Sequence, residues 1–256
     1  MLSVPNLPRV AEPSLRRTLA SIAAVASLTA SLGWVLAQQA AWPGQRVATG
    51  LLGYAVIGLA VALAASSRLR GPSFGLPNQI TLLRAALACL VGSALLANGQ
   101  APIESWSVST LVALALGLDA LDGRLARRLG RVSAFGARFD MEVDALLILM
   151  LALLVWQAGR VDVWVLAIGS MRYAFVLAGL SWSWLRRPLP PSWRRQAVCV
   201  IQGLALWVCM LPPVAPWLAG LAAGGALSAL AASFAADIRW LRLSAVASGS
   251  GLPEAR

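Results

Sequence analysis

About eight apolar segments, each close to 20 residues long, follow one another along this chain of 256 residues. A helix of roughly 20 apolar residues can cross the hydrocarbon core of a bilayer, where backbone groups must find their hydrogen bonds within the helix. The predicted spans are residues 18–38, 47–67, 80–98, 105–126, 137–158, 162–185, 195–213 and 216–237. The sequence therefore predicts an all-α, polytopic membrane protein.

The composition supports a membrane protein and argues against nucleic acid as a partner. Hydrophobic residues make up 59% of the chain and charged residues 12%, whereas about 25% charged residues is typical of soluble domains. The net charge is +11, but all 21 basic residues are arginines, and they stand in short clusters between apolar segments. Nucleic-acid binding favours a continuous basic face, so we expect these clusters to meet membrane lipids instead.

The arginine clusters stand at alternate ends of the predicted spans. They lie within residues 9–17, 68–70, 124–138, 186–195 and 239–242, whereas the intervening loops hold only Arg46 and Arg160. Because cytoplasmic loops are enriched in basic residues, we expect both termini and the turn after the fourth span to be cytoplasmic. The first apolar segment is longer than the core of a signal peptide, which favours a retained span. We expect the inner or plasma membrane of a bacterium.

Glycine and proline residues indicate where the chain divides. Residues 71–77 should interrupt helical structure, and Asn78 is a plausible N-cap for the helix that follows. We therefore expect a two-helix N-terminal extension over residues 1–70, a six-helix transmembrane core over 71–242, and a cytoplasmic tail over 243–256. Three prolines should separate the last two spans: Pro212, Pro213 and Pro216.

Histidine and lysine are absent, so carboxylates are left to act as general bases and as metal ligands. The three cysteines, Cys89, Cys199 and Cys209, lie far apart in apolar segments without a C-x-x-C pattern. We expect them to act as small packing residues and not as disulfides or metal ligands.

Half of the ten acidic residues fall between Asp119 and Asp144. Residues at intervals of three, four and seven share a helix face, which predicts one face with two carboxylates and two small residues. That face holds Asp119, Asp122, Gly123 and Ala126, and the next helix presents Gly136, Asp140 and Asp144 at intervals of four. A short turn makes the two helices antiparallel neighbours, so four carboxylates should converge near their cytoplasmic ends.

Four close carboxylates would repel one another unless cations lie among them. Mg²⁺ prefers carboxylate and phosphate oxygens, and a pair of divalent ions can hold both oxygens of a displacement at phosphorus. Gly123, Ala126 and Gly136 would let a bulky ligand or the neighbouring helix approach the backbone. Arg127 could offer two parallel hydrogen-bond donors to a phosphate.

Each of these features also has a structural interpretation. Glycine and alanine on a membrane helix often serve packing, single aspartates often serve hydrogen bonding, and arginines beside spans often mark topology. Clustered intramembrane carboxylates also occur in transporters and channels for divalent cations, and a non-catalytic membrane scaffold is a third alternative. Transport gives no reason for glycine, alanine and arginine at these intervals.

The combined spacing, D-x2-D-G-x2-A-R-x8-G-x3-D-x3-D, resembles the signature of the CDP-alcohol phosphotransferases. Every specified position is filled, from Asp119 to Asp144. The segment Asn78-x-x-Thr81-x-x-Arg84 is similar to the start of that family's first core helix. The resemblance covers roughly residues 71–242, and residues 1–70 fall outside it.

This resemblance implies a membrane enzyme of phospholipid synthesis, with CDP-diacylglycerol as donor, a small alcohol as acceptor and CMP as product. It implies a homodimer and two divalent cations, Mg²⁺ or Mn²⁺. The implied metal ligands are Asp119, Asp122, Asp140 and Asp144, with Asp144 also the general base. The implied CDP pocket is lined by Gly123, Ala126, Arg127 and Gly136, with Asn78 and Thr81 beside it.

The identity of the acceptor depends on three further arginines. Arg172 interrupts an apolar segment, and Arg194 and Arg195 stand where the seventh span begins. Members of the family that use phosphorylated alcohols carry basic residues in corresponding regions, which favours glycerol 3-phosphate or inositol phosphate. The alternative is that Arg172 pairs with an internal group and the other two only mark topology.

Overall fold

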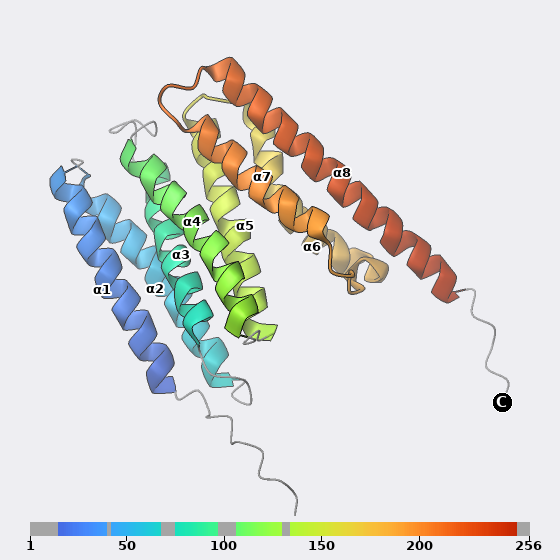
Figure 1. The fold of residues 1–256 in the computed structure, drawn as a ribbon, viewed down its shortest axis with the longest axis horizontal. Coiled ribbons are helices and arrows are strands. Elements are labelled where there is room, and N and C mark those ends of the chain that lie inside the picture. Colours follow the sequence, from blue (N-terminus) through green and yellow to red (C-terminus); the bar gives the residue numbers. More distant parts are fainter. Residues whose placement is uncertain (1–14, 40–41, 68–74, 97–105, 130–133, 250–256) are drawn as a thin grey trace, which may run out of the picture. The chain divides into compact units, whose positions relative to one another are not determined.

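Helices are the only regular secondary structure in the part of the protein that the structure describes (Figure 1). The structure is a computed structural model that describes residues 15–39, 42–67, 75–96, 106–129 and 134–249. Within these helices, the side chains of residues 15, 65–67, 121–129, 134 and 245–249 lie outside the description. The prediction of an all-α protein is confirmed.

Eight α-helices and three short 3₁₀ segments occupy the described residues. The α-helices are α1 (Leu15–Gln39), α2 (Gly44–Ser67), α3 (Leu76–Ser93), α4 (Trp106–Leu129), α5 (Ala134–Gln157), α6 (Leu166–Ser181), α7 (Trp193–Cys209) and α8 (Pro216–Gly249). The 3₁₀ segments are η1 (Ala94–Leu96), η2 (Val163–Val165) and η3 (Ser183–Arg186). Each apolar segment of the sequence therefore corresponds to one helix, although α6 is shorter and α8 longer than expected.

The start of α3 differs from the prediction. Asn78 was expected to be the N-cap, but the helix begins at Leu76 with Gly75 in the cap position, in an extended conformation. Pro77 falls in the first turn, where its fixed φ is compatible with a helix and its missing N–H would have had no partner. Asn78 consequently lies inside the helix and is buried.

Glycine and proline end or begin helices where local geometry favours them. Gly159, after α5, has a φ of 65° and donates its backbone N–H to the carbonyl of Trp156, as in a left-handed C-terminal cap. The predicted turn between the last two spans is confirmed, since α7 ends at Cys209 and α8 begins at Pro216. Proline suits this first helical position because it needs no N–H there.

Within the described part of the chain, five helical segments are long and apolar enough to cross a membrane: Arg16–Gln39, Gly44–Ala64, Leu76–Leu96, Val163–Ser181 and Pro216–Ser244. Their outward faces carry large apolar side chains that would be unfavourable in water; Leu52 of α2 is 67% exposed and Leu180 of α6 is 66% exposed. Hydroxyl groups on these helices bond to their own backbone, as Thr29 does to the carbonyl of Val25. The protein is an integral membrane protein, and the number of crossings stays a prediction.

The chain forms two compact units. The first comprises Met1–Ala101 and Thr110–Asp144, and the second comprises Pro102–Ser109 and Ala145–Arg256. Helices α4 and α5 each contribute residues to both units. The predicted division at residue 70 stays a prediction.

In the first unit, α1 and α2 pack against α3. Val25 of α1, Tyr54 and Val61 of α2, and Leu82 and Ala86 of α3 form one buried apolar cluster. The Tyr54 hydroxyl donates to the carbonyl of Ile22, and the amide of Gln79 donates to the hydroxyl of Ser21. A Cβ at Gly50 of α2 would lie 3.2 Å from the Cα of Leu90, so α2 and α3 are in close contact at that point.

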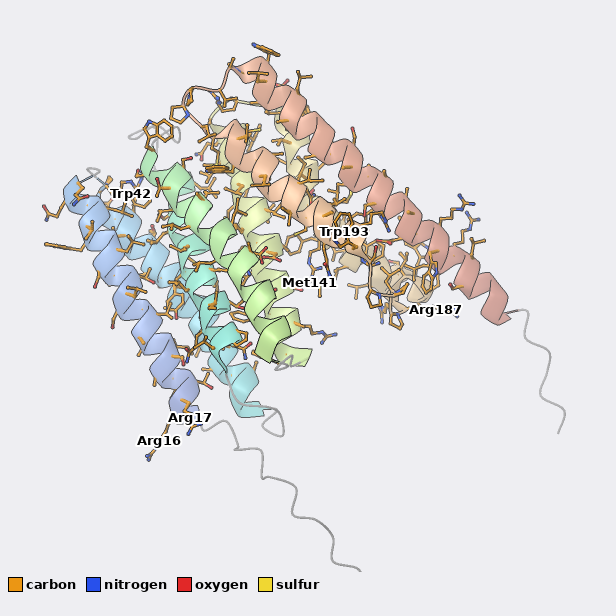
Figure 2. All side chains as sticks on the ribbon, viewed as in Figure 1. Arg16, Arg17, Trp42, Met141, Arg187 and Trp193 are labelled. Atoms are coloured by element: carbon orange, nitrogen blue, oxygen red, sulfur yellow. The ribbon has the colours of Figure 1, made fainter. Side chains whose placement is uncertain are left out.

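Charged and aromatic side chains occupy opposite ends of α1. Arg16 and Arg17 are exposed near its first turn, whereas Trp42 stands just beyond its last turn (Figure 2). The Trp42 ring lies under the guanidinium of Arg46, with 5.5 Å between the guanidinium carbon and the ring centroid. Aromatic and basic residues commonly stand at the ends of membrane spans in this way.

In the second unit, a buried arginine stabilises the turn between α7 and α8. Arg160 donates from Nε to the carbonyl of Cys209 at 3.0 Å and from Nη2 to the carbonyls of Leu211 and Val214. The Cys209 carbonyl ends α7, where no further helical turn supplies a donor, and the other two carbonyls lie in the connection to α8. A positive charge at this end also interacts favourably with the helix dipole.

Close packing also joins α5 to α6 and α6 to α8 within this unit. A Cβ at Gly169 of α6 would lie 2.7 Å from the Cα of Leu149. The rings of Phe175 and Phe234 meet edge to face, with 5.4 Å between their centroids. The cysteines Cys89, Cys199 and Cys209 are free thiols, and their role in packing stays a prediction.

Candidate active site

One buried stripe of α3 carries polar side chains. Asn78, Thr81 and Arg84 follow one another at intervals of three, so they share a face of the helix, and all three are buried. The Thr81 hydroxyl donates to the carbonyl of Pro77 at 3.1 Å, and Arg84 is only 1% exposed. A buried guanidinium needs partners for its charge and its N–H groups, and the next helices of this unit supply carboxylates.

Arg84 contacts three of the four aspartates that the sequence singled out. Its Nη1 atom lies 3.1 Å from an Asp119 carboxylate oxygen and 2.5 Å from an Asp140 oxygen. Its Nη2 atom donates to Asp144. The two terminal nitrogens of one planar group are therefore divided between Asp144 on one side and Asp119 with Asp140 on the other.

The three carboxylates converge closely enough to share one ion. One oxygen from each of Asp119, Asp140 and Asp144 lies within 4.8 Å of the others. The carboxylates are more accessible than Arg84, at 34%, 38% and 23% exposure. Three negative charges face one positive charge, so two negative charges are in excess among these residues. Oxygen donors with such an excess suit a hard divalent cation.

The remainder of the predicted motif lies outside the described side chains. Asp122, Gly123, Ala126 and Arg127 belong to the helical backbone of α4, and their side-chain positions are not part of the description. Gly136 lies in the first turn of α5, one turn before Asp140, and is half-buried. The predicted roles of these residues in the CDP pocket stay predictions, as do those of Asn78 and Thr81.

A second ionic cluster lies in the other unit and has the opposite charge ratio. Asp237 of α8 is 8% exposed, and one of its oxygens accepts hydrogen bonds from Nη2 of Arg194 at 2.5 Å and Nη1 of Arg195 at 3.2 Å. Arg194 also donates to the backbone carbonyl and hydroxyl of Ser233, one turn before Asp237. Two positive charges here face one negative charge.

Arg172, the third arginine predicted for the acceptor, lies on α6. Its side chain is half-buried. The same role in acceptor binding was predicted for Arg194 and Arg195. These three assignments stay predictions.

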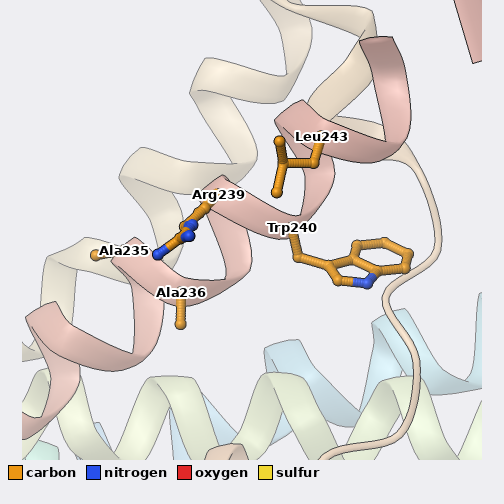
Figure 3. Close-up of a pocket in the computed structure, with 5 residues that line it drawn as sticks. All are labelled: Ala235, Ala236, Arg239, Trp240 and Leu243. Carbon is orange, nitrogen blue, oxygen red and sulfur yellow. The ribbon is translucent and has the colours of Figure 1, made fainter. Parts of the chain in front are cut away.

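The surface of α8 carries one shallow hollow of about 440 Å³ (Figure 3). Its described lining consists of Ala235, Ala236, Arg239, Trp240 and Leu243, all from this helix. Arg239 is the only charged residue among them, and none is a carboxylate. An exposed arginine and an indole ring are typical of a helix end at a membrane surface, and the described lining supplies no carboxylate for a metal.

Sequence reasoning missed two members of these clusters as site residues. Arg84 was noted only as part of a helix start, although its spacing of three from Thr81 and six from Asn78 places it on their face. Asp237 was overlooked because it is a single acidic residue at the end of an apolar segment. Its isolation was itself a signal, since a carboxylate at the edge of a span needs a cationic partner.

Comparison with known proteins agrees with this geometry. A family model described as CDP-alcohol phosphatidyltransferase matches residues 74–234, which is more than half of the chain. The matched range contains Arg84, the four aspartates of the motif, and Arg172, Arg194 and Arg195, whereas Asp237 lies beyond it. No solved structure matches the chain. The chain belongs to the CDP-alcohol phosphatidyltransferase family, and is therefore a membrane-embedded transferase of substituted phosphate groups that acts in phospholipid synthesis.

Proposed function

We propose that this protein transfers a phosphatidyl group from CDP-diacylglycerol to a small phosphorylated alcohol, such as glycerol 3-phosphate or inositol phosphate, and releases CMP. The observation that carries the proposal is the convergence of Asp119, Asp140 and Asp144 around Arg84, inside the family match. Phosphoryl transfer needs cations that stabilise the negative charge of the phosphate oxygens, and the acidic cluster can bind such cations. The chain contains no histidine for that chemistry.

Asp144 is the proposed general base. In this reaction the acceptor oxygen forms a bond to the lipid-linked phosphorus, the bond from that phosphorus to the CMP oxygen breaks, and the hydroxyl proton passes to Asp144. The hydrogen bond from Arg84 Nη2 orients the Asp144 carboxylate. Of the three carboxylates that Arg84 contacts, Asp144 is the least exposed, which limits competition from bulk water for its oxygens.

The carboxylates fit two divalent cations, Mg²⁺ or Mn²⁺, that Asp119, Asp122, Asp140 and Asp144 would hold together. The support is the oxygen-only donor set and the excess of two negative charges among the described members. Bound divalent ions supply stabilisation of the negative charge that develops on the phosphate oxygens. The proposed role of Asp122 has a direct test, since Asp122→Ala should weaken the binding of Mn²⁺.

The remaining roles are proposed from the family signature and from charge. Gly123, Ala126, Arg127 and Gly136, with Asn78 and Thr81, would line the CDP pocket. Arg194 and Arg195 would bind the phosphate of the acceptor, together with Arg172. The support for a phosphorylated acceptor is that Arg194 and Arg195 carry one more positive charge than their partner Asp237 neutralises.

We also propose that the active site and both termini face the cytoplasm, and that the protein is a homodimer in a bacterial inner or plasma membrane. The support for the sidedness is the distribution of the arginine clusters along the sequence, because basic residues accumulate on cytoplasmic loops. The dimer rests on the family resemblance alone.

The test is an assay of CMP release by the purified protein with CDP-diacylglycerol and Mn²⁺. The acceptor panel pairs each phosphorylated alcohol with its unphosphorylated counterpart: glycerol 3-phosphate with glycerol, and inositol phosphate with inositol. We expect CMP release with one phosphorylated acceptor, and loss of that release when a chelator removes the metal. Release with only an unphosphorylated alcohol would overturn the proposed acceptor class while leaving the transfer reaction intact.

A divalent-cation transporter would give a different pattern in the same preparation. Reconstituted vesicles would accumulate Mn²⁺, and no acceptor in the panel would release CMP. That result would overturn the proposed transfer reaction.

A further inference from the structure

We infer that Arg84 is the internal counter-ion of the metal site, a positioning residue that holds the carboxylates together when no divalent ion is bound and competes with that ion for them. The inference rests on the proposed metal site and concerns a residue to which the family signature from Asp119 to Asp144 assigns nothing. The affinity of the protein for its metal then depends on competition between the Arg84 guanidinium and the metal ion for the same carboxylate oxygens.

The contacts of Arg84 are the first support. Its two terminal nitrogens reach all three described carboxylates, and each of these contacts uses one carboxylate oxygen. Its Nε atom is buried and has no hydrogen-bond partner among the described residues. The guanidinium is therefore directed at the acidic cluster and not at the backbone of a neighbouring helix.

Another buried arginine, Arg160, bonds to backbone carbonyls. Arg160 is 8% exposed and donates to the carbonyls of Cys209, Leu211 and Val214, which are neutral and close a turn. These bonds give Arg160 a structural role in that turn. Arg84 is even more buried, at 1%, and its described partners are all ionised groups.

The contacts of Arg84 reduce the electrostatic repulsion among the three carboxylates. Without a cation, three carboxylates within 4.8 Å would repel one another strongly in a medium of low dielectric constant. The single charge of Arg84 offsets part of this repulsion. A divalent ion offsets more of it, but it must share the same oxygens with the guanidinium. Removing Arg84 should therefore destabilise the metal-free protein most and leave the metal-bound protein less affected.

The experiment measures thermal unfolding of detergent-purified Arg84→Gln in EDTA and in saturating Mn²⁺. We expect the Tm in EDTA to fall by about 5 °C or more, and the fall in Mn²⁺ to be less than half as large. By linkage, the greater stabilisation by metal corresponds to tighter binding, which we expect to be about tenfold in the Kd for Mn²⁺. Titration with Mn²⁺, followed by the electron paramagnetic resonance signal of the free ion, measures that Kd directly.

Two further variants separate this role from a purely structural one. Arg160→Gln is the matched control, since it removes a buried arginine whose described bonds to the carbonyls of Cys209, Leu211 and Val214 stabilise a turn in the other unit, and its Tm should fall by the same amount with and without Mn²⁺. Arg84→Lys keeps the positive charge, so its Tm in EDTA should lie between those of wild type and Arg84→Gln, with a Kd within about threefold of wild type.

Equal losses of Tm in EDTA and Mn²⁺ for Arg84→Gln, with an unchanged Kd, would overturn the inference. If Arg84→Gln does not fold, the Arg84→Lys variant decides, because the same losses in both conditions would overturn it there. Absence of Mn²⁺ binding by the wild-type protein would overturn the proposed metal site itself, and this inference with it. Loss of CMP release in Arg84→Gln with metal binding unchanged would overturn only the inference.

Discussion

The two ionic clusters of this protein have the same plan with the charges exchanged. In the first unit, one almost completely buried arginine holds three partly exposed carboxylates. In the second, one buried carboxylate, Asp237, holds two partly exposed arginines, Arg194 at 40% and Arg195 at 30% exposure. In both, the single buried residue organises the more numerous residues around it.

The opposite signs of the excess charge indicate which kind of ligand each cluster can bind. A buried charge needs partners for its own stability, so Arg84 and Asp237 account for part of the charge around them. The remainder is two negative charges in the first unit and one positive charge in the second. A divalent cation fits the first remainder and an anionic group, such as a phosphate, fits the second.

The largest expected effect comes from neutralising the proposed base in the acidic cluster. Asp144→Asn should lower kcat for CMP release by about 10²- to 10⁴-fold, because the amide cannot accept the proton of the acceptor hydroxyl. It should also weaken Mn²⁺ binding, since it removes one of the two excess negative charges. The matched control is Asp162→Asn at an exposed aspartate before η2, which should leave both quantities unchanged. More than half of wild-type activity in Asp144→Asn would refute the assignment.

A smaller effect is expected from the buried carboxylate of the basic cluster. Asp237→Asn removes the carboxylate charge that orients Arg194 and Arg195 through hydrogen bonds. The KM for the phosphorylated alcohol substrate should therefore rise about tenfold. Steady-state kinetics would show the rise in KM with a lesser change in kcat, and the Kd for Mn²⁺ should stay the same.

The control for this variant is Arg239→Gln, which removes an exposed arginine from the same helix. It should leave the KM unchanged. A folded Asp237→Asn protein with a wild-type KM for the phosphorylated acceptor would argue that the basic cluster is only structural.

The smallest effect should come from a change that touches neither cluster. Gly169→Ala would place a Cβ 2.7 Å from the Cα of Leu149, and overpacking of this kind costs about 1–3 kcal/mol. Thermal unfolding should show the loss, whereas the Kd for Mn²⁺ and the KM for the acceptor should not change. Gly225→Ala, which meets nothing within 4 Å, is the control and should not be destabilised. A shift in either ligand affinity would show that packing of α6 is coupled to a cluster.

Much of the fold was predictable because lipid restricts the choices. An apolar segment of about 20 residues in a bilayer must satisfy its own backbone, so each segment became a helix. The end of α8 was not predictable in this way. Its apolar segment ends near residue 237, but the helix continues to Gly249, because a helix can extend beyond the hydrocarbon core into water.

The candidate site was predictable where its residues are close in sequence. Asp140 and Asp144 share a helix face by their spacing, and Asp119 lies on the preceding helix. Arg84 comes from a helix 35 residues before Asp119, and a contact between such distant residues depends on packing that no local pattern encodes. The contact between Asp237 and the arginines of α7 was missed for the same reason.

The packing of α1 and α2 has a consequence for how copies of this protein can associate. Glycines of α2 place its backbone against Leu90 and Cys89, and the α1–α2 pair buries Leu82 and Ala86 of α3. That flank of α3 is consequently already occupied by the protein's own chain. If two copies associate, the second subunit would have to dock on a different helix surface, so α1 and α2 restrict which surfaces are open to self-assembly.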